Sequence, residues 1–145
     1  MRSSTRTKSQ AFDAWLTHID WALHKDAINA VDTIDGLSAG TRPVGNSQLR
    51  AVVNTAKVCS DSRTFKKFIN KRAKRRAKAS KEKKAAFWRA LSSRIDHVKN
   101  EHVPAAEAAI EQATGADCTL SDADVMRIVR SYMGHLIAHC HLRAT

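Results

Sequence analysis

Apolar residues recur along most of this chain at the spacing of an amphipathic α-helix. From Ser9, which suits an N-cap, an apolar residue stands every three or four positions, at Phe12, Trp15, Leu16, Ile19 and Leu23. The next apolar positions, Ile28, Val31, Ile34 and Leu37, drift away from this stripe. We therefore expect a kink or a new start near Lys25 and Asp26, with a second short helix after it.

The clearest loop is expected at residues 36–46, because Gly and Pro residues there break helices, and Asn46 and Ser47 can cap the next helix. Arg42 lies in this loop, but the spacing matches no phosphate-binding loop. A short amphipathic helix follows and ends near Cys59. Asp61 then suits the positively polarised start of the following helix.

One apolar register frames a very basic stretch at residues 63–84. The register comprises Phe65, Ile69, Ala73 and Ala77, and continues at Phe87, Leu91, Ile95 and Val98. Ile69 and Phe87 are 18 residues apart, which is five full helical turns. We therefore expect one long helix from residue 62 to about residue 100. Ser80 is the position at which this helix could divide, because serine can cap the start of a second one.

The C-terminal third predicts two more helices. Pro104 suits the first turn of one, and Gly115 can end it. Ser121 and Asp124 form a capping box for the last helix, whose broad apolar face predicts a central core helix. The whole pattern predicts an all-α bundle of about five helices. Residues 1–8 are expected to be a flexible basic arm, and residues 9–145 a single domain.

The charge of this protein is concentrated in the basic stretch. Twelve of the 25 Lys and Arg residues lie there, against the single acidic residue Glu82, and the whole chain carries a net charge of +11. They are Arg63, Lys66, Lys67, Lys71, Arg72, Lys74, Arg75, Arg76, Lys78, Lys81, Lys83 and Lys84. The rest of the chain holds equal numbers of basic and acidic side chains. Such a concentration of charge predicts a polyanionic partner.

Nucleic acid is the partner that this stretch favours, since Lys and Arg bind phosphates and gain from counterion release. We expect binding to the backbone of RNA or single-stranded DNA without sequence readout, because no helix-turn-helix, zinc-finger or zipper pattern accompanies the charges. An anionic membrane surface is the rival partner. It is disfavoured because the basic stretch lacks a wide apolar face.

The sequence contains no apolar run of the roughly 18 residues that would cross a bilayer, and no apolar signal-peptide core. A cytoplasmic location is therefore expected. Three cysteines, Cys59, Cys118 and Cys140, show no CxxC spacing and are expected to be reduced structural thiols.

Candidate catalytic and metal-binding residues gather in the last helix. His135 and His139 are four residues apart on one helical face, but no third metal ligand can be named. Arg130 and His135 have the R-x4-H spacing that resembles the motif of HEPN ribonucleases. That resemblance implies that Arg130 stabilises phosphate and His135 transfers a proton. No other catalytic constellation can be assembled, so we expect no enzymatic activity, no cofactor and no metal.

In size, charge and helical character the chain resembles the small subunit of multi-subunit CRISPR effector complexes, the ribonucleoprotein machines of an antiviral defence. The resemblance implies a non-catalytic subunit that stacks along RNA or a target strand, beside backbone subunits and copies of itself. Apolar surface residues such as Trp21 or Trp88 would then touch neighbours. From its position opposite Phe12, however, Trp21 is expected to pack on another helix of the chain, with an exposed aromatic as the alternative.

Overall fold

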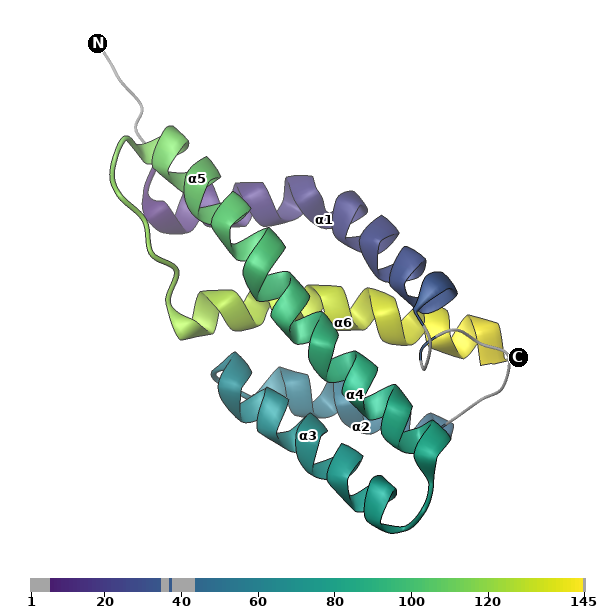
Figure 1. Cartoon of the computed structure of the whole chain (residues 1–145). Coiled ribbons are helices and arrows are strands. Elements are labelled where there is room, and N and C mark those ends of the chain that lie inside the picture. The colour runs from purple at the N-terminus through teal and green to yellow at the C-terminus, as the bar shows by residue number, and fades with distance from the viewer. Residues whose placement is uncertain (1–5, 35–36, 38–43, 145) are drawn as a thin grey trace.

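The computed structural model describes residues 6–34, 37 and 44–144, and almost all of them are helical (Figure 1). The elements are α1 (Lys8–Thr33), α2 (Asn46–Val58), α3 (Ser62–Lys78), α4 (Glu82–His97), the π-turn η1 (Val98–His102), α5 (Val103–Thr114) and α6 (Asp122–Ala144). The described residues contain no strand, which confirms the predicted all-α class. None of these helices is long and apolar enough to span a bilayer.

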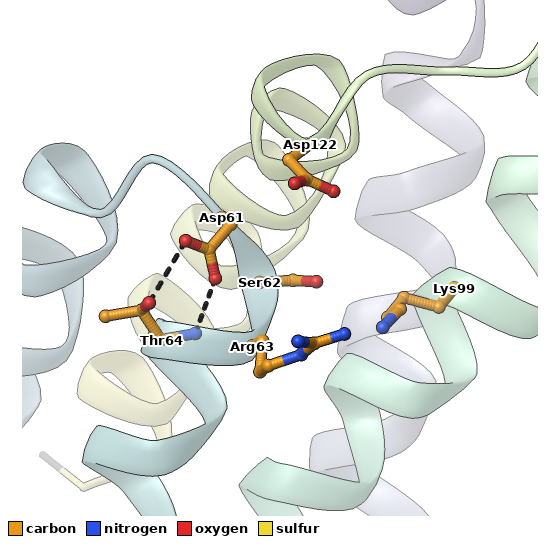
Figure 2. Close-up of a pocket in the computed structure, with 6 residues that line it drawn as sticks. All are labelled: Asp61, Ser62, Arg63, Thr64, Lys99 and Asp122. Atoms are coloured by element: carbon orange, nitrogen blue, oxygen red, sulfur yellow. Dashed lines mark hydrogen bonds between the residues drawn. The ribbon is translucent and has the colours of Figure 1, made fainter.

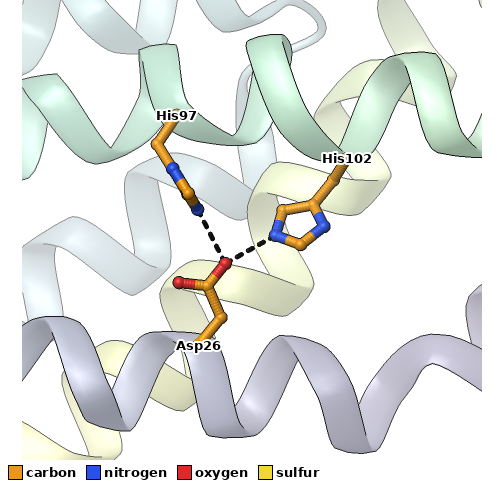
Figure 3. A group of neighbouring side chains, drawn as sticks. All are labelled: Asp26, His97 and His102. Carbon is orange, nitrogen blue, oxygen red and sulfur yellow. Dashed lines mark hydrogen bonds and ion pairs between the residues drawn. The ribbon is translucent and has the colours of Figure 1, made fainter.

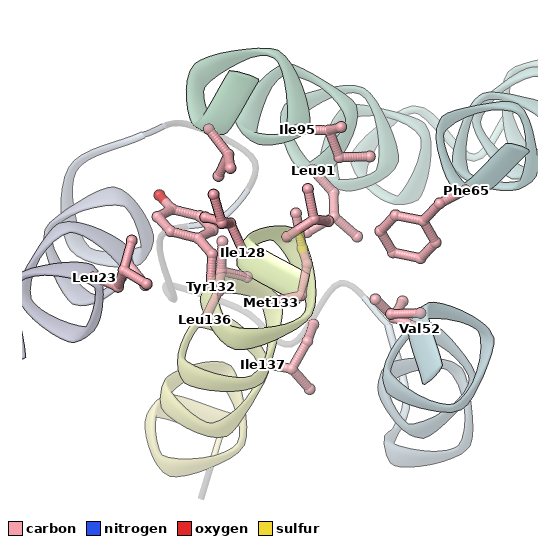
Figure 4. Close-up of a cluster of buried hydrophobic side chains, with 14 of the residues drawn as sticks. Leu23, Val52, Phe65, Leu91, Ile95, Ile128, Tyr132, Met133, Leu136 and Ile137 are labelled. Carbon is pink, nitrogen blue, oxygen red and sulfur yellow. The ribbon is translucent and has the colours of Figure 1, made fainter. Parts of the chain in front are cut away.

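Helix α6 lies at the centre of the bundle, as its broad apolar face predicts. Its side chains Tyr132, Met133, Leu136 and Ile137 point into a core shared with α1, α2, α3 and α4 (Figure 4). Leu23, Val52, Phe65 and Leu91 are the fully buried residues that these neighbouring helices contribute beside it. Burial of this apolar surface is the main force that holds the five segments together.

Helices α4 and α5 are joined without a break by η1, so that residues 82–114 form one continuous rod. The rod crosses α6 diagonally, with α5 packed on α1 and α3 packed on α4 (Figure 1). Pro104 occupies the first turn of α5, and Gly115, at φ 73°, ends it. Both of these predicted boundaries are confirmed.

The expectation of one long helix from residue 62 to about 100 is wrong, because the chain reverses at Ser80. Ser80 adopts a left-handed conformation with φ 58°. Its N–H bonds to the Ala77 carbonyl, and the Lys81 N–H bonds to the Arg76 carbonyl, which is the Schellman pattern of a helix C-terminus. The apolar register on each side of Ser80 is real, but the two halves face each other in an antiparallel α3–α4 hairpin.

Of the kink or new start predicted near Lys25 and Asp26, the new start with a second short helix is wrong, since α1 runs from Lys8 to Thr33 as one helix. Asp26 faces inward and bonds to side chains of α4, η1 and α6, so a polar residue occupies a position that the pattern would assign to an apolar one. The apolar stripe shifts there because α1 packs against both α6 and α5.

Several helix starts differ from those expected. Thr7, rather than Ser9, caps α1 through a reciprocal capping box with Gln10. Gly45 stands at the N-cap of α2 without a side-chain bond. Asp61 caps α3 as expected, and Ser121 Oγ accepts the Asp124 N–H at the start of α6.

Two expectations fall largely on residues that the structure does not describe. Most of the proposed loop at residues 36–46, with Arg42, lies outside the described residues, as do residues 1–5 of the proposed basic arm. Lys8, at the end of that proposed arm, is the first residue of α1.

The reversal at Ser80 predicts the effect of a single substitution. Ser80 is exposed, and glycine adopts positive φ without the Cβ clash that serine suffers. We expect Ser80→Gly to raise the free energy of unfolding by up to about 1 kcal/mol, measured by urea denaturation.

Ser93→Gly is the matched control, because Ser93 is also exposed but lies inside α4. This control should lower the free energy of unfolding by about 0.5–1 kcal/mol. An equal loss in both variants would contradict a left-handed residue at position 80.

Candidate nucleic-acid interface

Ten of the twelve predicted cations lie on a helical hairpin and form no ion pair with a described acidic residue. We define the basic hairpin as α3, the turn at residues 79–81 and the first turn of α4. Phe65, Ile69 and Phe87 form its buried face, so the Lys and Arg side chains are directed outward. Eight of the twelve cations are exposed, namely Arg63, Lys67, Lys71, Lys74, Arg75, Lys78, Lys81 and Lys83.

The other two predicted cations hold the fold together. The Lys66 ammonium lies 2.7 Å from each carboxylate oxygen of Asp96 on α4. The Arg72 guanidinium packs over the rings of Phe68 and Trp88, at 4.6 and 5.4 Å from their centroids, and donates to the Gln48 side chain on α2. These contacts fix α3 against α4 and α2, so Lys66 and Arg72 belong to the scaffold of the hairpin.

The remaining ten cations make no ion pair with any described residue of the chain. Two acidic residues lie near them in the sequence: Glu82 faces Arg89 at 3.8 Å, and Asp61, the cap of α3, lies near Arg63 without forming an ion pair with it. Half-buried Arg76 and Lys84 belong to this unpaired group together with the eight exposed residues. A field of one sign is thereby concentrated along one projecting element.

A groove of about 510 Å³ runs between α3 and α4 at the basic hairpin. It is lined by Asn70, Ala73, Lys74, Ala77, Lys78 and Arg89. Its lining combines two small alanines with three cations. A phosphate chain could therefore lie close to the helix backbones while Lys and Arg contact it from both sides.

Arg63 is separated from this groove, because it stands at the opposite end of α3. There it lines a pocket of about 320 Å³ with Lys99, Asp122 and the cap residue Asp61 (Figure 2). Asp61 Oδ1 accepts the Thr64 N–H at 2.7 Å, and this bond with that from the Thr64 hydroxyl lowers the pKa of Asp61. Two carboxylates balance two cations in this pocket, so it lacks the one-sided charge of the groove.

A second polar cluster, which sequence reasoning missed, joins α1 to the rod. Asp26 Oδ2 lies 2.7 Å from Nε2 of His97 and 2.7 Å from Nε2 of His102 (Figure 3). Asp26 Oδ1 accepts hydrogen bonds from Arg94 Nη2 at 3.0 Å and from the Tyr132 hydroxyl at 3.3 Å. One carboxylate thus holds side chains from three other elements.

The π-turn explains how both imidazoles reach one oxygen. In an α-helix, residues five apart lie about 140° apart around the axis, so His97 and His102 would face different directions. In η1 the Val103 N–H donates to the Val98 carbonyl, five residues earlier, which brings residues five apart to one side. No sequence signal marks this turn, and His97-x4-His102 is not a helical metal-ligand spacing.

Burial and hydrogen bonding set the ionisation of this cluster. Partial burial would raise the pKa of Asp26, but the hydrogen bonds and charges of His97 and His102 outweigh it and lower the pKa below its ordinary value. Burial raises the pKa of Tyr132 to about 12, although the Arg94 hydrogen bond opposes this shift. Tyr132 is therefore a neutral hydrogen-bond donor at physiological pH.

The two residues of the HEPN-like spacing bind different helices. Arg130 Nε donates to the Ala56 carbonyl at 2.8 Å, and its Nη2 donates to the Cys59 carbonyl at 3.3 Å, so Arg130 caps the end of α2. His135 Nε2 lies 2.8 Å from Asp20 on α1. The chain does not bring Arg130 and His135 into one site.

The histidine pair of the last helix does not converge on one point either. His139 bonds to Asp32 at 3.0 Å, far along α1 from the Asp20 partner of His135. The second ring nitrogen of His135 faces His24 Nδ1 at 3.3 Å.

The aromatic and cysteine side chains correct two expectations and confirm a third. Trp21 is 67% exposed and stacks on His24 of its own helix, so the expected packing on a neighbouring helix is wrong. Trp88 is fully buried and is no surface residue. Cys59, Cys118 and Cys140 are buried free thiols whose pKa values burial raises, as expected of structural cysteines.

Comparisons with known proteins add no family to this picture, since no family model, no curated protein and no solved structure matches the chain.

The pKa of Asp26 predicts how stability changes with pH. A carboxyl whose pKa is lowered by folding stabilises the protein above its unfolded pKa of about 4, and this contribution is lost as the pH falls further. We expect Asp26→Asn to lower the free energy of unfolding by about 1–3 kcal/mol at pH 6, with a smaller loss below pH 4. Urea denaturation over a pH series measures the difference.

Asp117→Asn is the control, because Asp117 is exposed and makes no described contact. Its effect should stay within about 0.5 kcal/mol at every pH. If Asp26→Asn lowered the free energy of unfolding equally at pH 3 and at pH 6, the charge of Asp26 would not be what stabilises the contact between α1 and the rod.

Proposed function

We propose that this protein binds the sugar–phosphate backbone of nucleic acid through the basic hairpin, without reading base sequence and without catalysing a reaction. The observation that carries the proposal is the set of ten cations on this hairpin that make no ion pair within the described chain. Collecting so many like charges is unfavourable for the isolated protein, and a polyanion offsets this repulsion.

The side chains of the hairpin support contact with phosphates rather than with bases. Seven of the ten unpaired cations are lysines, which act as flexible point charges. Base stacking would need exposed aromatic rings, but Phe65, Phe87 and Trp88 are buried, and Phe68 lies half-buried beneath Arg72. Backbone contact is therefore the mode that this surface favours.

The rigidity of the hairpin supports a scaffold role. Arg72 and Lys66 fix α3 to its neighbours, and the Schellman turn fixes the reversal. The unpaired cations are thus presented by a folded element, so ordering the chain does not weaken binding, as it would for a disordered basic tail.

The resemblance to small subunits of CRISPR effector complexes suggests the setting for this activity. In that setting copies of the protein would lie side by side along RNA or a target strand, and the hairpin of each copy would contact the backbone. Exposed Trp21 on α1 would be available to a neighbouring subunit. The proposed ligand is the backbone of either RNA or single-stranded DNA.

The proposal that no reaction is catalysed has its own support. Arg130 is engaged with backbone carbonyls at the end of α2, and His135 with Asp20 on α1. The two side chains do not face a common site at which a phosphate could bind, so no observation favours the ribonuclease alternative.

A charge-neutralised hairpin tests the proposal. We expect Lys74→Gln, Lys78→Gln and Lys81→Gln together to weaken binding of single-stranded RNA roughly tenfold or more at low salt, because three phosphate contacts are lost. The slope of log K against log salt should become shallower by about 2, since each contact contributes about 0.7. Fluorescence anisotropy over a salt series measures both, and a denaturing gel of the same samples should show intact RNA.

The matched control removes the same charge from other surfaces. Lys25, Lys57 and Lys99 are exposed lysines outside the hairpin, and their triple Gln variant should bind nearly as the unmodified protein does. Equal weakening in the two triple variants would show that only net charge matters. Shortened RNA that is lost with His135→Ala would instead favour the ribonuclease.

A further inference from the structure

We infer that Asp26, His97 and His102 bind a late first-row divalent metal ion, with Zn²⁺ the best fit, which clamps α1 to the α4–α5 rod. Two imidazole nitrogens and one carboxylate oxygen lie within 4.8 Å of one another at this point. This site is separate from the basic hairpin, and the inference does not rest on the proposed function.

The backbone is built so that these three atoms converge. The π-turn is an unusual element, and its consequence here is that His97 and His102 face the same oxygen of Asp26 (Figure 3). Such turns inside α-helices are frequent at functional sites. Since the rest of the rod is α-helical, the turn serves to place this pair.

The donor set and its surroundings suit an ion such as Zn²⁺. Two neutral imidazoles and one carboxylate are the ligands of open zinc sites, in which a water completes the tetrahedron. The ligand side chains are 15–28% exposed, so the fourth position can be reached from solvent. Arg94 and Tyr132 hold the other carboxylate oxygen, which fixes the orientation of the ligating one.

Only a small movement is needed to admit the ion. Ligand bonds of about 2.0–2.1 Å in a tetrahedron place neighbouring ligand atoms about 3.3 Å apart. The two nitrogen–oxygen separations of 2.7 Å would therefore each open by about 0.6 Å. Each neutral imidazole would carry its proton on Nδ1 and coordinate through Nε2, and a protonated ring would release one proton to solvent.

Two other Asp–His pairs join α1 to α6, but each supplies a different geometry. His135 bonds to Asp20 and His139 bonds to Asp32, and the His135 ring also faces His24. They provide the matched controls, because they contain the same residue types and also have their aspartates on α1, whereas their histidines lie on α6 and not on the rod.

Titration of the untagged protein with Zn²⁺ and with Co²⁺ tests the inference. At a hundredfold excess of Zn²⁺ over its Kd, we expect Tm to rise by roughly 5–10 °C, because the ion binds the folded state. Co²⁺ should give the visible ligand-field absorption of a tetrahedral ion. The affinity for both ions should fall at least tenfold in His97→Ala and in His102→Ala, and should be unchanged in His139→Ala and in the double variant His24→Ala/His135→Ala.

His102→Cys keeps the test decisive if an alanine variant fails to fold. A cysteine at this position retains a zinc ligand, so Co²⁺ should add a near-ultraviolet thiolate charge-transfer band that the unmodified protein lacks. The inference is overturned if neither ion binds the unmodified protein. It is also overturned if binding survives in both His97→Ala and His102→Ala, if it is lost in a control variant instead, or if the thiolate band is absent.

Discussion

The reversal of the chain at Ser80 is the constraint on which the rest of the structure depends. Two amphipathic segments with one continuous apolar register could form a single rod, but each would then leave much of its apolar face in water. The left-handed turn folds α3 back on α4, so that Phe65 and Ile69 meet the face of Phe87 and Leu91. Burial of these faces against each other offsets the unfavourable conformation of one exposed serine.

This reversal also decides what the charges can do. On a single rod they would surround a straight helix on most sides. In the hairpin the apolar faces of α3 and α4 are buried against each other. The unpaired cations are left on the outside and around a groove. The rest of the chain is electrically balanced, so the positive field is concentrated on this one element, and any long-range attraction of a polyanion would be directed there. The rod has a second polar contact, with α1, where the π-turn brings His97 and His102 together on Asp26.

Much of this architecture can be predicted from the sequence, because periodicity reports which face of a helix is buried. The central role of α6, the cap at Asp61, and the end of α5 at Gly115 follow from such patterns. Ser80 could be named as a possible break because serine caps helices, but the reversal there could not be predicted, since Gly is the usual signal for a left-handed C-terminus. The cluster of Asp26, His97 and His102 could not be predicted either, because in an α-helix His97 and His102 would face different directions and only the π-turn brings them to one side. The basic residues were visible in the sequence, but the structural duty of Lys66 and Arg72 depends on contacts with α4 and α2 that no local pattern encodes.

The central claim is that the basic hairpin is the surface that touches nucleic acid, and lysine footprinting tests it most directly. Free and RNA-bound protein would be acetylated briefly under identical conditions, and the modification of each lysine would be quantified by mass spectrometry. The account predicts that RNA protects Lys71, Lys74, Lys78, Lys81 and Lys83, whereas the exposed lysines Lys25, Lys57 and Lys99 react equally in both states. Protection of the second group, or equal reactivity of the hairpin lysines with and without bound RNA, would contradict it.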